Sequence, residues 1–122
     1  MTGFGLLGHL KEMVEGAGLA VELFANDVPV LPGVQSLAQA GFIPGGTKDN
    51  LSFVESITHF NADLPLIMKY ILADAQTSGG LLISLPEVSA KDLLSDLKKR
   101  AIPASIVGKI ITESGGYRIV VK

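Results

Sequence analysis

The sequence of 122 residues contains neither cysteine nor tryptophan, and only 18% of its residues are charged. Without cysteine the chain offers no disulfide, no zinc site built on thiolates and no cysteine nucleophile. The formal net charge is −2 and no block of basic residues is present, which argues against nucleic acid as a partner. Because the lack of cysteine is compatible with a reducing compartment, we expect a cytoplasmic protein.

Long apolar runs are also missing, although 48% of the residues are hydrophobic and the mean hydropathy is +0.43. The best candidate, residues 64–72, is interrupted by Pro65 and Lys69 and is far shorter than the roughly 20 residues that span a bilayer. No signal peptide is visible, and we expect no contact with a membrane. The apolar content therefore indicates either a large core or a face that docks on another surface.

Hydrophobic periodicity predicts the secondary structure. An amphipathic helix follows Leu6 and ends at Gly16 and Gly18, and a second follows Ser89, which forms a capping-box pattern with Asp92. Shorter helices are predicted at 34–40 and 65–72, and Asp63 is the predicted cap of the latter. Strands are predicted at 19–24, 81–85, 104–111 and 117–121, with a tight turn at 115–116 before the last strand. Residues 51–60 fit neither period.

In chain order these elements predict an α+β or α/β layer domain, with about four strands and helices packed against them. No internal repeat, low-complexity tract or linker divides the sequence. We therefore expect a single domain over residues 1–122.

The stretch TGFGLLGHL matches the pattern G-x-G-x-x-G through Gly3, Gly5 and Gly8. A dinucleotide-binding fingerprint needs a strand ahead of the first glycine, and only two residues precede it here. Each glycine inside a helix costs about 1 kcal/mol relative to alanine, so another backbone or a ligand is expected to come close. The alternative is that Gly3 and Gly5 belong to a loop before the helix.

Two further stretches are rich in glycine and polar residues. PGGTKDN, residues 44–50, is predicted as a loop that either binds an anion or starts a capped helix, and it lacks the ending of a P-loop. In ADAQTSGG, residues 73–80, Thr77 and Ser78 are candidate phosphate donors. Asp74 is a candidate cation ligand, but we favour a loop held by its own hydrogen bonds, because one carboxylate rarely makes a Mg²⁺ site.

The two histidines have no evident partners for a Ser/His/Asp catalytic set. His9 lies near the edge of the apolar stripe of the first helix. A general base needs a partner and a suitable geometry, so we interpret His9 as a hydrogen-bonding helix residue or as a contact to another domain.

Taken together and in this order, TGFGLLGHL, PGGTKDN and DAQTSGGLLISLP resemble the C-terminal domain of the selenophosphate synthetases (selenide, water dikinases). This family belongs to the superfamily typified by aminoimidazole ribonucleotide synthetase. The resemblance covers the chain from Thr2 to about Gly108. It implies an α+β, three-layer α/β/α unit with a mixed sheet of about four strands and partial ferredoxin-like topology, in agreement with the pattern above.

The resemblance also implies an enzyme that makes selenophosphate, AMP and phosphate from selenide, ATP and water, with Mg²⁺ and a monovalent cation. Such an enzyme is a homodimer of two-domain subunits, and ATP lies mainly against the N-terminal domain. That domain would supply the Cys or selenocysteine nucleophile and the metal-binding aspartates. An aspartate that the family places ahead of T-G-F-G has no counterpart before Thr2. We therefore expect residues 1–122 to be the C-terminal domain alone, inactive and without a tightly bound cofactor.

For this chain the resemblance implies no catalytic residue and no metal ligand. It implies a lining of the nucleotide-phosphate site and a contact with the N-terminal domain. The expected lining residues are Thr2, Gly3, Gly5, Thr47, Asn50, Thr77 and Ser78.

Two alternatives stay open. The chain could come from another ATP-dependent enzyme of the superfamily, such as thiamine-monophosphate kinase or the hydrogenase maturation dehydratase. It could also be a non-catalytic assembly module that self-associates through an exposed apolar face.

Overall fold

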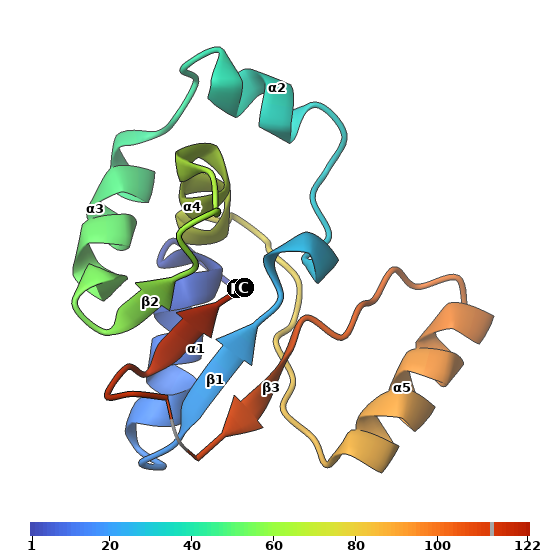
Figure 1. Ribbon diagram of the computed structural model, residues 1–122. Helices are drawn as coiled ribbons and strands as arrows, with labels where there is room; N and C mark the ends of the chain where they lie inside the picture. The colour runs from blue at the N-terminus through green and yellow to red at the C-terminus, as the bar shows by residue number, and fades with distance from the viewer. Residues whose placement is uncertain (113) are drawn as a thin grey trace.

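A four-stranded mixed sheet organises the chain (Figure 1). The computed structural model describes residues 1–112 and 114–122. In chain order the elements are α1 (Gly5–Glu15), β1 (Ala20–Leu23), the 3₁₀ turn η1 (Ala25–Asp27), α2 (Val34–Gln39), α3 (Gly45–Glu55), β2 (Thr58–Phe60), α4 (Leu66–Ala73), α5 (Glu87–Lys99), β3 (Gly108–Ile111) and β4 (Ile119–Val121). The predicted α+β class and the mixed sheet of four strands are confirmed.

The strands lie in the order β2-β4-β1-β3. β4 is parallel to both β1 and β2, whereas β3 is antiparallel to β1. The register places Val21 beside Ile119 and Leu23 beside Val121, and all four side chains are buried. Alternation along each strand therefore directs these residues to one face of the sheet.

Helix α1 lies against this buried face, and α3 and α4 pack on α1 and on each other. The inner stripe of α1 consists of Leu6, Leu7, Leu10 and Val14. The periodicity predicted these residues, but Met13 and Ala17, which it also placed in the stripe, are exposed. Leu72 of α4 and Val54 of α3 complete the same core. Burial of one such side chain stabilises the fold by roughly 1.5–3 kcal/mol. This core fixes the position of the N-terminus of α1 relative to α3 and α4.

The opposite face of the sheet carries an ionic cluster. Glu22 of β1 is only 8% exposed, lies opposite Lys109 of β3, and its carboxylate is 3.2 Å from the Lys109 ammonium. The ammonium of Lys122, directly after β4, contacts the other carboxylate oxygen. The hydrogen bond from Lys122, with a smaller contribution from Lys109, lowers the pKa of Glu22 below its ordinary value of 4.5. The cluster thus ties β1 to β3 and to the end of β4.

Helix α5 stands apart from the rest of the chain, beyond β3, at the end of two extended segments (Figure 1). Every residue of α5 is at least partly exposed, so the apolar stripe predicted for a core is only half-buried. The helix begins at Glu87, directly after Pro86, and within the described residues no side chain caps it. The capping box at Ser89 and Asp92 is therefore wrong, because Pro86 stands at the cap position and the helix starts three residues earlier than a cap at Ser89 requires.

The strand predicted at residues 81–85 is also wrong. The segment is extended but unpaired among the described residues, and Leu81 and Ile83 are 87% and 53% exposed. A run of strand-forming residues becomes a strand only when a second strand supplies its hydrogen bonds, and this pairing is not a local property. For the same reason the strand predicted at 104–111 is confirmed only over Gly108–Ile111, where β1 pairs with it.

Other boundaries also differ from the predictions. The PGGTKDN segment forms the start of a helix, one of the two predicted alternatives, since α3 begins at Gly45; the predicted side-chain cap is not present there in the described chain. The ambiguous residues 51–60 contain the end of α3 and then β2. Pro65, not Asp63, precedes α4, and no side-chain cap is present there within the described chain. The tight turn at Gly115 and Gly116 is confirmed by the positive φ of both residues. None of the described helices is both long and apolar enough to cross a bilayer.

The ionic cluster predicts a pH-dependent stability. Because the pKa of Glu22 is lowered in the folded chain, its contribution is complete above pH 4.5 and is lost as the pH falls through the lower folded value. We expect Glu22→Gln to reduce the urea midpoint at pH 7 and the difference from the unaltered chain to shrink below pH 4.5. Glu15→Gln, which removes an exposed pair with Lys11, is the matched control. A constant difference down to pH 3 would contradict this account.

Candidate functional site

The three glycine-rich stretches that stand out in the sequence meet at one place. Residues 2–5 lead into α1, whose first residue is Gly5. Residues 44–50 contain the start of α3, and residues 73–80 begin at the last residue of α4. Because α1, α3 and α4 pack pairwise against one another, the starts of α1 and α3 come close to the end of α4. We refer to this junction as the loop junction.

Asn50 links the three parts of the loop junction. Its side-chain amide donates to the carbonyl of Gly3 at 2.7 Å and to the carbonyl of Ala73 at 3.1 Å. Both donors of one amide group are therefore used to join α3 to the segment before α1 and to the end of α4.

The backbone of α1 touches the end of α4 directly at Gly5. This residue has φ of +69°, and a Cβ atom there would lie 2.7 Å from the carbonyl oxygens of Ala73 and Asp74. The expectation that another backbone comes close is thus confirmed for Gly5. At Gly8 no other backbone comes close: a Cβ there would meet the side chain of Phe4, directly before the same helix, at 2.8 Å.

Asp74 is held inside the loop junction by two side chains. The hydroxyl of Thr47, which is 1% exposed, donates to one carboxylate oxygen at 2.7 Å. The amide of Gln76 donates to the other at 3.0 Å. The interpretation of residues 73–80 as a loop held by its own hydrogen bonds is therefore confirmed at Asp74. The hydrogen bond from Gln76 to Asp74 was not predicted, although a position two residues after Asp74 is typical of a local side-chain contact.

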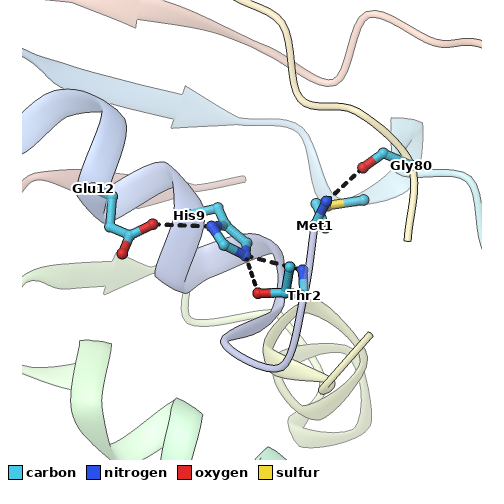
Figure 2. Close-up of polar contacts among 5 residues, drawn as sticks. All are labelled: Met1, Thr2, His9, Glu12 and Gly80. Atoms are coloured by element: carbon cyan, nitrogen blue, oxygen red, sulfur yellow. Dashed lines mark hydrogen bonds and ion pairs between the residues drawn. The ribbon is translucent and has the colours of Figure 1, made fainter. Parts of the chain in front are cut away.

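The segment before α1 is held from two sides. The carbonyl of Thr2 accepts from the backbone N–H of Gln76 at 3.0 Å. The backbone N–H of Thr2 donates to Nε2 of His9 at 3.0 Å, and the other ring nitrogen of His9 lies 3.0 Å from a carboxylate oxygen of Glu12 (Figure 2). His9 is therefore a hydrogen-bonding helix residue, as interpreted from the sequence.

Three polar groups at the loop junction point to solvent. Thr77 and Ser78 are exposed, and their hydroxyls make no hydrogen bond within residues 1–112 and 114–122. The backbone N–H of Gly3 is likewise unpaired within these ranges, and a Cβ on Gly3 would meet no atom within 4 Å. Ser78 has φ of +55°, a conformation that costs a non-glycine residue about 1–3 kcal/mol. Each of these groups can therefore donate to a bound anion.

The predicted lining residues therefore fall into two sets. Gly3, Thr77 and Ser78 are open to solvent, whereas Gly5 and Thr47 are buried and the amide of Asn50 is committed to two carbonyls. Thr2 is exposed, but its backbone N–H is used by His9. In the described part of the chain, no group of three or more His, Asp or Glu side chains is arranged to hold a metal ion.

A shallow pocket of about 190 Å³ adjoins the loop junction on the side of α2. Its wall is mainly apolar, with Leu37, Phe42 and Ile71 among its lining residues, and Thr47 and Asp74 belong to its polar part. Sequence periodicity gave no indication of this pocket, because it forms between α2, α4 and the start of α3.

Comparison with known proteins gives a consistent result along the whole chain. Residues 1–122 match the family described as AIR synthase related protein, C-terminal domain. Proteins named selenide, water dikinase from Cronobacter sakazakii and Myxococcus xanthus are 41% and 39% identical over 120 residues, which is 98% of this chain and 34% of each relative. The protein of the same name from Porphyromonas gingivalis is 42% identical over 123 residues, 99% of this chain and 35% of the relative. The chain thus spans about a third of the length of these relatives.

Gly5 provides the first test of the loop junction. We expect Gly5→Ala to destabilise the chain by about 2–4 kcal/mol, because the new Cβ meets two carbonyl oxygens and the residue is left with a positive φ. Gly3→Ala is the matched control and should change the free energy of unfolding by less than about 0.5 kcal/mol. Urea unfolding followed by circular dichroism measures both. Equal effects of the two substitutions would show that Gly5 is not in close contact with α4.

Thr47 provides the second test. Thr47→Val keeps the shape of the side chain but removes the hydroxyl that donates to Asp74, and a hydrogen bond to a charged group contributes about 1.5–3 kcal/mol. We expect a loss of stability of that order in thermal or urea unfolding. Thr77→Val, at an exposed hydroxyl without a partner in the described chain, should leave stability almost unchanged. The account fails if the two variants are equally stable.

Proposed function

This chain belongs to the family of AIR synthase related proteins, C-terminal domain, and we propose that it acts as the C-terminal part of a selenide, water dikinase. In that reaction selenide, ATP and water give selenophosphate, AMP and phosphate. The proposal is supported by relatives of that name that are about 40% identical over nearly the whole chain. We propose that the chain lines part of the nucleotide-phosphate site and contacts the N-terminal domain of the enzyme.

The observation that carries this proposal is the meeting of the three stretches at the loop junction. At least 22 residues separate one stretch from the next in the sequence. Even so, Asn50 of the second stretch contacts the first and the third, and Gln76 of the third contacts the first. Stretches that only begin or end a helix are not expected to lie close to one another. Convergence at one exposed edge is expected of a shared ligand site.

We propose two roles among the lining residues. The N–H of Gly3 and the hydroxyls of Thr77 and Ser78 donate to phosphate oxygens, since all three are exposed and unpaired in the described chain. Thr2, Gly5, Thr47 and Asn50 hold these donors in place through the contacts described above. ATP itself fits this edge, because hydrogen-bond donors suit an anionic phosphate chain.

Metal ions do not fit the residues of this edge. Both carboxylate oxygens of Asp74 already accept from Thr47 and Gln76. Among the described residues, no group of three or more His, Asp or Glu side chains could hold a metal ion. We therefore assign no ligand for Mg²⁺ or a monovalent cation to the described residues. Because phosphoryl transfer requires charge stabilisation around the phosphates and a positioned nucleophile, we propose that the chain alone is inactive and binds ATP weakly.

A role in assembly is the second candidate, and the exposed apolar residues favour it. Leu81 and Val88 are 87% and 73% exposed, and α5 contributes no fully buried side chain to the described structure. Such a surface is typical of a site that another protein surface covers. In the main proposal the N-terminal domain or the second subunit of a homodimer covers it.

Joining the chain to the N-terminal part of a relative tests the proposed function. We expect a fusion of the preceding two-thirds of the Cronobacter sakazakii relative to this chain to convert ATP to AMP only when selenide is present. Thr77→Ala and Ser78→Ala should each lower kcat/KM by about tenfold, the order expected for one hydrogen bond to a charged group. Nucleotide products separated by anion-exchange chromatography provide the measurement.

Ser52→Ala, on an exposed position of α3, is the matched control and should retain full activity. Formation of ADP alone, independent of selenide, would contradict the proposal and favour another ATP-dependent enzyme of the superfamily. A fusion that folds but never consumes ATP would favour the assembly role.

A further inference from the structure

We infer that His9 is a positioning residue, which holds the Thr2–Gly3 segment through one defined tautomer of its imidazole ring. The inference rests on the proposed function insofar as Gly3 donates to a phosphate. The tautomer itself follows from contacts within the chain and is independent of that function.

The two neighbours of the ring require the same tautomer. The backbone N–H of Thr2 can only donate, so Nε2 of His9, 3.0 Å away, must carry the lone pair (Figure 2). A carboxylate can only accept, so Nδ1 of His9, 3.0 Å from Glu12, must carry the proton. The hydrogen bond of one ring nitrogen determines which nitrogen carries the proton. Here the contacts with Thr2 and with Glu12 both require the proton on Nδ1.

The ring is also fixed in orientation. Its centroid lies 6.4 Å from that of Phe4 with the two planes nearly perpendicular, and Glu12 lies one turn further along the same helix. The imidazole is therefore held by α1 on both sides and presents Nε2 to the segment that precedes the helix. The hydroxyl of Thr2 lies within 3.0 Å of the same nitrogen.

His9 completes the set of contacts that leave one donor free. The carbonyl of Thr2 accepts from Gln76, the carbonyl of Gly3 accepts from Asn50, and the N–H of Thr2 donates to His9. With these three groups satisfied, the N–H of Gly3 is the unpaired backbone group of the segment within the described chain. His9 thus acts on the phosphate site through Thr2 and does not touch the ligand.

Imidazole ¹⁵N spectra of the unaltered chain test the tautomer directly. The chain has only two histidines, and His59→Gln assigns the signals. We expect a protonated Nδ1 and an unprotonated Nε2 for His9 at neutral pH. The reverse pattern, or a rapidly exchanging mixture of both tautomers, would overturn the inference.

The positioning role is tested in the fusion enzyme. We expect His9→Ala to raise the KM for ATP about tenfold with a smaller effect on kcat. The reason is that the N–H of Gly3 is then no longer held in position to bind phosphate, whereas the chemical step is not directly affected. His9→Gln should restore part of the loss, since its side-chain oxygen can accept from Thr2. His59→Ala is the matched control, because this ring lies on β2, packs against Tyr117 and makes none of the contacts described for the loop junction.

An unchanged KM in folded His9→Ala would overturn the positioning role. If the unaltered fusion shows no selenide-dependent activity, the proposed function fails instead. The ¹⁵N spectra then still decide whether His9 holds Thr2.

Discussion

The approach of Gly5 to the carbonyl oxygens of Ala73 and Asp74 is the contact on which the candidate site depends. At this distance no side chain fits between the start of α1 and the end of α4, and the positive φ excludes most residues other than glycine. Once the two backbones touch, the amide of Asn50 can reach the carbonyls on either side. A single residue without a side chain thus allows three helix ends to share one edge.

Two kinds of polar group lie at this edge: those that hold the backbone of the loops, and those that we propose to bind an anion. Asp74, Thr47 and Asn50 have most of their hydrogen-bonding capacity satisfied within the chain, which makes the backbone of the loops rigid. Fixed donors bind an anion better than mobile ones, because less order has to be created on binding. Most of these polar side chains bond to other groups of the chain. Their contribution to the candidate site is therefore to hold the donors in place, and not to contact the anion themselves.

The sequence predicted local features well and long-range pairing poorly. The stripe of α1 and the cost of glycine in a helix predicted both the helix and the close backbone at Gly5. Pro44 and the glycines after it have the composition of a loop, yet packing against α1 and α4 extends α3 to Gly45. Residues 81–85 have the composition of a strand but lack a partner strand among the described residues, which composition alone does not reveal. The contact between His9 and Thr2 was not predictable either, since it requires the chain to turn back at Gly3.

The high apolar content can now be attributed to a definite surface. The core on one face of the sheet uses the apolar residues of α1, β1 and β4, whereas Leu81, Ile83 and Val88 remain exposed. Leu81 and Ile83 come three and five residues after Ser78 in the chain, so the apolar surface begins shortly after the candidate site ends. A protein surface that covers Leu81 and Ile83 must therefore lie beside the exposed hydroxyls of the loop. Under the proposed function, one contact would therefore both cover the apolar surface and complete the phosphate site.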